Sequence, residues 1–226
     1  MKDYFPEILI EYTYPSGCKY LRSFLDKEPD KLLKLLVAKG RTLAKSNPVA
    51  GKKFGKWINF LNNNSLRDSN YKIMGLFIIG ASLIQTGMIE KGLESLEKAF
   101  DEAKSDYPEL IPEILIEQST GYLFTRDYVK AEKVLSDAEI LVKKENKKDL
   151  SGKILINKAG ILFQQRRLEE SLSCLARSEK ILRDCNDDIN LAVIYRNRGN
   201  IFFFMARYKE ALLDYERQKL FSIIKN

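Results

Sequence analysis

The sequence predicts an all-α protein built from antiparallel helical hairpins that stack on one another. Three observations lead to this fold class. A pattern of small and bulky residues occurs four times after residue 76, and successive copies start 39 or 40 residues apart. The chain has 226 residues, of which 45% are hydrophobic, but no apolar run long enough for a membrane span. A fixed period in this range is typical of a solenoid, in which each hairpin buries its apolar face against its neighbours.

Each copy of the pattern begins with a small residue and has a bulky residue three positions later. Bulky, small, bulky and small residues then follow at offsets of 9, 12, 16 and 19. Residues three and four apart share one face of a helix, so the small residues let two helices approach closely while the bulky ones fill the space to the next hairpin. The copies are Gly80, Leu83, Ile89, Gly92, Leu96, Ala99; Ser119, Tyr122, Tyr128, Ala131, Leu135, Ala138; Ala159, Leu162, Leu168, Ser171, Leu175, Ser178; and Gly199, Phe202, Tyr208, Ala211, Tyr215, with Gln218 breaking the last place.

Four hairpins are assigned to residues 71–226. Turn signals separate the two helices of three of them, and Asp127 is expected to cap the helix that starts at Tyr128 because its carboxylate can accept from free amides there. The turn signals are Thr86-Gly87, Arg126-Asp127 and Ala206-Arg207. The hairpins cover about residues 71–105, 108–146, 150–185 and 188–226.

Upstream, residues 31–66 are interpreted as a degenerate, basic hairpin that caps the array. Arg41 and Asn47 occupy places that should be large and apolar, although Pro48 after Asn47 is a good helix start. Terminal repeats are expected to be atypical. The residues that keep the register are Ala38, Ala50, Phe54 and Trp57.

Residues 1–30 match no part of the pattern and are left unassigned, and the stretch at 8–14 fits a strand or a short helix. No apolar run leads to a small-residue cleavage site, so no secretory signal is expected. Cys18, Cys174 and Cys185 are sparse and lack CxxC spacing, which favours a reducing compartment and argues against a metal cluster. We therefore expect a cytoplasmic protein.

The residues that carry the pattern resemble the tetratricopeptide repeat (TPR) family. The last hairpin is the nearest match, with Tyr195-Arg196-Asn197-Arg198-Gly199-Asn200, then Phe202, then Arg207-Tyr208-Lys209-Glu210-Ala211-Leu212. The other hairpins keep the small and large skeleton, with a period longer than the usual 34 residues of the family. The resemblance implies a right-handed superhelical solenoid. It also implies a concave groove, lined by the first helix of each hairpin, that holds a peptide or a helix of a partner protein.

The resemblance also implies which residues bind that partner. Asn side chains early in the first helix of a hairpin hold the backbone of a bound peptide, since an amide both donates and accepts. Glu117, Thr120, Ile78 and Ala81 depart from this pattern in the earlier hairpins. The expected partner-binding residues are Asn157, Asn197, Asn200, Phe124, Phe163, Gln164, Arg196, Phe203 and Phe204. Further residues expected on the groove are Phe77, Ile84, Gln85, Glu113, Ile116, Leu123, Lys153 and Ile156.

Two alternatives stay open for these side chains. The phenylalanines could be buried between hairpins, and Asn157 and Asn197 could bond to a neighbouring helix. A hydrophobic helix or peptide anchor would suit the groove if the aromatic side chains are free, because such side chains dominate interface energetics.

Charge gives a second candidate site. Residues 1–70 carry 13 Lys and Arg against 7 Asp and Glu, and no acidic residue lies between Lys31 and Leu66. A basic face at 31–56 could contact the phosphates of a nucleic acid or an acidic partner, or could simply be a solvated capping surface. The candidate contacts are Lys34, Lys45, Lys52, Lys53 and Lys56.

Catalysis is not expected. The chain has no histidine, which excludes Ser-His and Cys-His nucleophile pairs and His-ligated zinc, and it has no glycine-rich phosphate loop. Hence neither a catalytic site, a metal nor a cofactor is predicted. The predicted function is a non-enzymatic scaffold that binds a partner protein. The alternatives are a regulatory or nucleic-acid-associated protein that uses the basic 31–56 face, and the repeat sensor region of a signalling ATPase.

The last helix suggests self-association. It carries Leu212, Tyr215, Leu220, Phe221, Ile223 and Ile224. We expect an uncovered apolar stripe of this width to associate, so a homodimer through the C-terminal helix is a further hypothesis.

Overall fold

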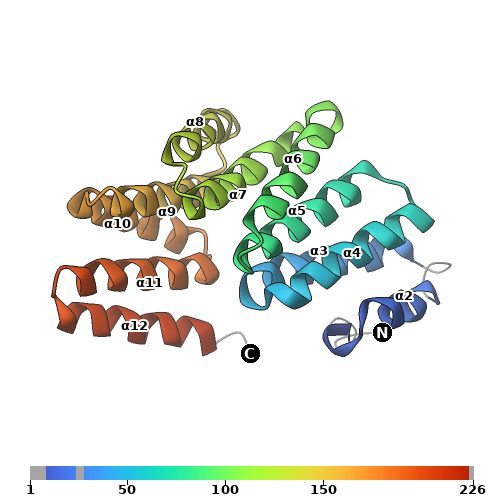
Figure 1. The fold of residues 1–226 in the computed structure, drawn as a ribbon, viewed down its shortest axis with the longest axis horizontal. Helices are drawn as coiled ribbons and strands as arrows, with labels where there is room; N and C mark the ends of the chain where they lie inside the picture. Colours follow the sequence, from blue (N-terminus) through green and yellow to red (C-terminus); the bar gives the residue numbers. More distant parts are fainter. Residues whose placement is uncertain (1–8, 24–27, 224–226) are drawn as a thin grey trace. The chain divides into compact units, whose positions relative to one another are not determined.

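The computed structural model describes residues 9–23 and 28–223 (Figure 1). Helices and turns make up this part of the chain, and no strand occurs in it. The prediction of an all-α solenoid of helical hairpins is confirmed. The chain forms two compact units, residues 1–121 and 122–226.

Unit 1 contains the helices up to the first part of α7. Residues 9–11 are also helical, so in the described part of residues 8–14 the helix alternative holds and the strand alternative is wrong. The elements are α2 (Tyr14–Arg22), α3 (Pro29–Ser46), α4 (Pro48–Asn64), α5 (Ser69–Gln85), α6 (Ile89–Asp106), the short 3-10 helix η1 (Pro108–Leu110) and α7 (Ile111–Phe124).

Unit 2 begins within the last turn of α7 and contains the remaining helices. Its α9 and α10 form one hairpin, and α11 and α12 form the next (Figure 1). The elements are α8 (Tyr128–Glu145), α9 (Lys148–Gln164), α10 (Leu168–Asp184), α11 (Asp188–Phe204) and α12 (Tyr208–Ile223).

Side-chain caps begin several of these helices, as the sequence predicts. The Asp127 carboxylate accepts a hydrogen bond from the Lys130 amide at 3.1 Å, ahead of α8. The Asn47 side chain accepts from the Ala50 amide at 3.2 Å, with Pro48 in the first turn of α4. Both side chains satisfy amides that have no partner within the helix.

The small residues of the pattern lie between the paired helices. Ala131, Ala159 and Ala211 are at most 2% exposed. In the third full hairpin the Ser171 hydroxyl donates to the carbonyl oxygen of Ala159 at 2.7 Å, which fixes α10 against α9. The predicted packing of small residues against bulky ones is confirmed.

In the first full hairpin the approach of the two helices is closest at paired glycines. A Cβ placed on Gly92 would lie 2.9 Å from the carbonyl oxygen of Gly80 and 2.7 Å from the Ile84 side chain. Such a contact is too short for an ordinary carbon atom, so α5 and α6 need glycine at this crossing.

No helix in the described part of the chain is both long enough and apolar enough to span a membrane. The three cysteines are free thiols, each half-buried, as expected from their spacing.

Candidate functional site

The residues expected to bind a partner gather at the C-terminal ends of the first helices of the unit 2 hairpins. Phe124, Gln164 and Phe204 are the last residues of α7, α9 and α11, and they stand 40 residues apart in the sequence. This spacing gives them the same place in the repeat. All three are exposed, so each end of a first helix offers a side chain to solvent.

An aromatic cluster joins α9 to α11. The rings of Phe163 and Phe204 meet edge to face with centroids 6.0 Å apart. Phe203, the neighbour of Phe204, has its ring 5.6 Å from that of Tyr208 at the start of α12. Phe203 is 61% exposed and Phe204 49% exposed. These two phenylalanines are therefore available to a partner, whereas Phe163 is half-buried beneath Phe204.

The three asparagines differ in what they can offer. Asn157 is half-buried and already has a partner within the protein. Asn200 is exposed, and its side-chain oxygen accepts a hydrogen bond from the Tyr215 hydroxyl at 2.9 Å. Asn197 is half-buried on α11, seven residues before Phe204 and so on the same helix face. The predicted role in peptide binding therefore fits Asn197 better than the other two.

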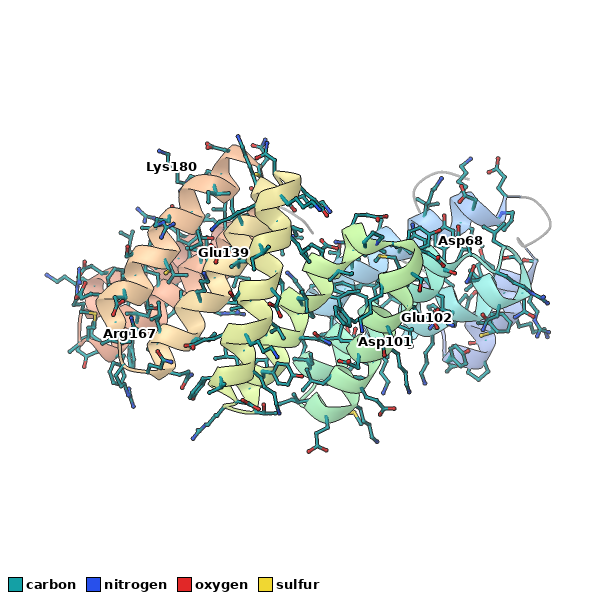
Figure 2. The ribbon with its side chains drawn as sticks, turned by 90° about the horizontal axis from the view of Figure 1, so that it is seen from above. Asp68, Asp101, Glu102, Glu139, Arg167 and Lys180 are labelled. Carbon is teal, nitrogen blue, oxygen red and sulfur yellow. The ribbon has the colours of Figure 1, made fainter. Side chains whose placement is uncertain are left out.

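Two arginines beside the aromatic cluster stand out by their lack of a carboxylate. Arg167, Arg183, Arg198, Arg207 and Arg217 all form ion pairs. Figure 2 shows Arg167 on its helix. Arg166 and Arg196 are exposed, and within the part of the chain that the structure describes neither forms an ion pair. Arg166 instead stacks over the ring of Phe204 at 4.3 Å.

We call this region the α9–α11 surface and define it by six residues. They are Phe163, Arg166, Arg196, Asn197, Phe203 and Phe204. Sequence reasoning missed Arg166. Its place in the turn after α9, at φ 64°, could have been suspected because Arg126 occupies the equivalent turn after α7 at φ 60°.

A buried ionic network holds the helices under this surface. Arg198 on α11 donates to both carboxylate oxygens of Asp214 on α12, at 2.6 and 2.8 Å, and to Glu179 on α10 at 2.6 Å. The Tyr195 hydroxyl donates to Glu179 at 2.8 Å. Hydrogen bonds to Asp214 raise the pKa of Arg198, in spite of its burial, so the guanidinium stays charged. The sequence pattern did not reveal this network.

Burial alone would raise the pKa of Glu179. Hydrogen bonds from Arg183, Tyr195 and Arg198 outweigh burial, so the pKa of this carboxyl lies below its usual range. The network therefore carries its full set of charges near neutral pH and fixes the orientation of α11, on which Arg196, Asn197, Phe203 and Phe204 stand.

In unit 1 the corresponding face is closed. Arg41 on α3 donates to both carboxylate oxygens of Glu113 on α7, at 2.5 and 2.7 Å, and its guanidinium lies 5.8 Å from the ring of Phe77 on α5. Phe77, Ile84 and Ile116 are buried. The expectation that these three residues line an open groove is wrong, because they pack inside unit 1. Ile156 in unit 2 is buried as well, so the expectation is wrong there too.

The basic residues of the second candidate site are already engaged. Lys34 pairs with Asp30 at 2.7 Å. The Lys53 ammonium donates to the carbonyl oxygens of Ile10 and Tyr12 at 2.6 and 3.1 Å. Lys56 lies 5.5 Å from the ring of Tyr14.

The two remaining lysines of that site differ in exposure. Lys45 is exposed and has a partner, while Lys52 is half-buried. Contact of the 31–56 face with phosphate stays a prediction.

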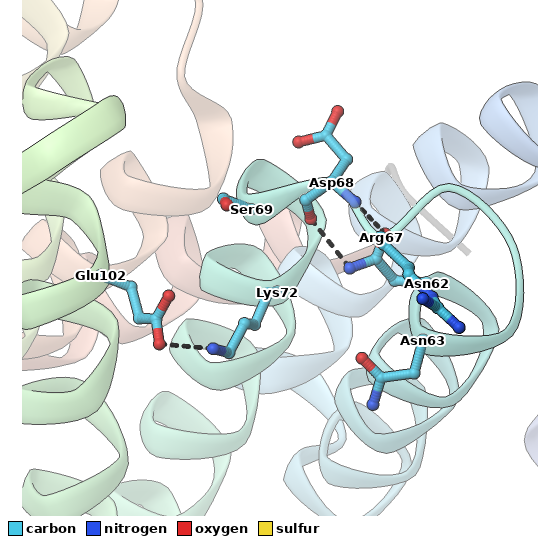
Figure 3. A pocket seen from close by; sticks show the side chains of 7 residues that line it. All are labelled: Asn62, Asn63, Arg67, Asp68, Ser69, Lys72 and Glu102. Carbon is cyan, nitrogen blue, oxygen red and sulfur yellow. Dashed lines mark hydrogen bonds and ion pairs between the residues drawn. The ribbon is translucent and has the colours of Figure 1, made fainter.

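A hollow at the turn between α4 and α5 is the most evident concavity that the figures show (Figure 3). Its polar groups satisfy one another. The Asn62 side chain donates to the Asp68 carbonyl oxygen at 2.8 Å and accepts from the Asp68 amide at 2.9 Å, while Lys72 pairs with Glu102. We interpret it as a structural turn. Among the described residues, no group of three or more His, Cys, Asp or Glu side chains is placed to hold a metal ion.

Comparisons with known proteins agree with the fold. Residues 150–217 match the tetratricopeptide repeat family model. The structure of BtubC (BKLC) from P. vanneervenii is 13% identical, with 88% of this chain and 91% of that chain covered and a TM-score of 0.54. MamA AMB-1 is 16% identical over 85% of this chain and 99% of that chain, with a TM-score of 0.41. MamA MSR-1 is 15% identical over 87% and 100%, with a TM-score of 0.42.

A comparison with curated proteins gives no match. The family match covers α9 to α12, the four helices that also carry most of the α9–α11 surface and its ionic network. BtubC shares the helical solenoid fold. Residues 150–217 therefore belong to the tetratricopeptide repeat family, and the resemblance predicted from the sequence is confirmed.

Proposed function

We propose that the α9–α11 surface binds a peptide or a helix of a partner protein. The observation that carries this proposal is the pair of exposed phenylalanines, Phe203 and Phe204, on a helix whose orientation is fixed by buried ion pairs. Large aromatic side chains held rigidly at a surface contribute much contact area to an interface at little cost in conformational entropy.

The chemistry of the surface defines the partner further. An apolar or aromatic side chain of the partner would pack on Phe203 and Phe204, and a carboxylate nearby would pair with Arg166 or Arg196. Along α11, Arg196 and Phe203 are seven residues apart, or about 10 Å at 1.5 Å per residue. The partner segment therefore needs an acidic group about that far from its apolar anchor. Asn197 lies between the two and can hydrogen-bond the backbone of the segment.

A general role as a protein-interaction scaffold is supported by the tetratricopeptide repeat match, and repeats of this type are generally non-catalytic. The alternative uses of the chain have less support. The lysines of the 31–56 face are largely engaged within the protein. A sensor role in a signalling ATPase would need a nucleotide-binding domain outside this sequence.

Differential capture tests the proposal. Native lysate is passed over the wild-type protein, over Phe203→Ala/Phe204→Ala, and over the control Ile140→Ala, which removes an exposed apolar side chain on α8. A protein retained by wild type and control but lost from the double variant is identified by mass spectrometry. The segment responsible is then synthesised and its affinity measured by fluorescence anisotropy.

We expect the double variant to bind that segment at least about tenfold more weakly than the control does. Equal affinity of the double variant and the wild type for every retained partner would contradict the proposal.

A further inference from the structure

The outer face of α12 differs in composition from the outer faces of the other second helices. In α6, α8, α10 and α12 the residues at offsets 10, 14, 17 and 21 of the repeat are exposed in every hairpin. They are Glu90, Glu94, Glu97 and Asp101 in α6; Val129, Lys133, Ser136 and Ile140 in α8; Glu169, Ser173, Ala176 and Lys180 in α10; and Lys209, Leu213, Glu216 and Leu220 in α12. Figure 2 shows Asp101 and Lys180 at two of these places.

Leucine occupies two of these solvent-facing positions in α12. Leu213 is 48% exposed and Leu220 is 61% exposed, and the neighbouring Leu212 is 60% exposed. The equivalents of Leu213 are Glu94, Lys133 and Ser173, all polar. Because these positions face away from the adjacent hairpins throughout the array, a further hairpin stacked after α12 would leave them exposed. Their apolar character requires a different explanation.

The charges around these leucines are self-complementary. Lys209 lies one turn before Leu212 and Leu213, and Glu216 lies one turn after them, on the same helix face. Both are exposed, and no ion pair to either lies within residues 9–23 and 28–223. Most other charged residues of the second helices do form ion pairs, for example Glu170 with Arg167 and Lys98 with Glu94.

A two-fold axis midway between Leu212 and Leu213 uses all of these features. In an antiparallel pair of α12 helices, the axis brings Leu212 of one copy against Leu213 of the other. Lys209 and Glu216 are equally far from the axis, so each Lys209 meets Glu216 of the second copy and two ion pairs form. Leu220 reaches the start of the second α12, where Tyr208 is exposed. An isologous contact of this kind closes after two copies.

We propose that the outer face of α12 binds a second copy of this chain, antiparallel, through Leu212, Leu213 and Leu220 and the reciprocal Lys209 and Glu216 ion pairs. This surface is distinct from the α9–α11 surface, so a dimer leaves partner binding possible. A contact made by one helix from each copy is small, and the dimer is accordingly weak and concentration-dependent.

Charge reversal tests the pairing. Sedimentation velocity over a concentration series gives the dissociation constant of the wild-type dimer. Lys209→Glu and Glu216→Lys each place like charges opposite one another at both ends of the contact, and each is expected to weaken the dimer roughly tenfold. The double variant Lys209→Glu/Glu216→Lys restores opposite charges and is expected to recover the wild-type constant. An equal mixture of the two single variants is expected to form a heterodimer.

Removal of the leucines tests the apolar part. Leu213→Lys/Leu220→Lys copies the lysines that α8 and α10 carry at the same two positions, so its fold is expected to be unchanged by circular dichroism. It should be monomeric throughout the series. Ile140→Lys, at the equivalent position of α8, is the control and should dimerise like the wild type. A monomeric wild type, a dimer that survives the leucine changes, or a double charge variant no stronger than the singles would each overturn the proposal.

Discussion

Arg198 and Asp214 form a two-point ion pair that joins α11 to α12 across the inside of the last hairpin. The two hydrogen bonds are 2.6 and 2.8 Å long, and the Asp214 side chain is 3% exposed. The same guanidinium also contacts Glu179 on α10, so one side chain links three helices. An arrangement of this kind costs much when one partner is removed, because a buried charge is left unpaired.

The first prediction concerns this pair. Asp214→Asn should lower the free energy of unfolding by about 3 kcal/mol, because Arg198 then keeps only one carboxylate partner in a buried place. Urea denaturation followed by circular dichroism measures the loss. Glu170→Ala is the control, since it breaks an exposed ion pair with Arg167 and should cost at most about 1 kcal/mol. Similar losses for the two variants would show that burial of the Arg198 pair adds nothing.

The second prediction concerns pH. The pKa of Glu179 in the folded protein is lowered from its usual value, so this carboxyl stabilises the fold at pH above its unfolded-state pKa of about 4.3. The stabilisation is lost as the pH falls through the lower folded-state pKa. Glu179→Gln should therefore differ from the wild type in unfolding free energy more at pH 7 than at pH 3. A difference of the same size at both pH values would contradict the ionic role of Glu179.

The third prediction concerns glycines in helices. Gly92→Ala should destabilise the protein by about 1 to 3 kcal/mol, because the new methyl meets the Gly80 carbonyl oxygen of the facing helix. Gly160→Ala is the matched comparison, since its methyl meets only the end of the Leu123 side chain, at 2.9 Å. That variant should be neutral or more stable by up to about 1 kcal/mol, from the better helix propensity of alanine. Thermal melts of the two proteins give the ranking, and the reverse order would refute the close crossing.

The fourth prediction concerns Asn197. Once a partner segment is known, Asn197→Ala should weaken its binding about fivefold, because the segment loses a hydrogen bond worth roughly 1 kcal/mol. The melting temperature should stay within about 2 °C, since the side chain is only half-buried on the surface of α11. A large fall in melting temperature would instead make Asn197 a structural residue.

Much of the hairpin packing could be predicted because it is periodic. Ala131, Ala159 and Ala211 recur at one place in the repeat, and a helix crossing needs a small residue there whatever surrounds it. Asp127 and Asn47 could be predicted as caps because capping depends on residues only three positions away.

The remainder depends on contacts that periodicity does not encode. Arg41 could be recognised as a charged residue in an apolar place, but its partner Glu113 is 72 residues further along the chain. Without that contact the sequence gives no reason for Phe77 to be covered. The exposure of Phe203 and Phe204 likewise follows from the positions of neighbouring helices. The domain boundaries and the partner-binding residues stay predictions.

The clasp between Arg41 and Glu113 also bears on how unit 1 unfolds. In a simple stack each repeat contacts only its immediate neighbours, so the end repeats can fray while the others persist. Arg41 bypasses α5 and ties the first hairpin directly to the third. Loosening either end of unit 1 then breaks contacts at the other, so hydrogen exchange in α3 and α7 should report a shared opening event, with unit 1 melting as a block.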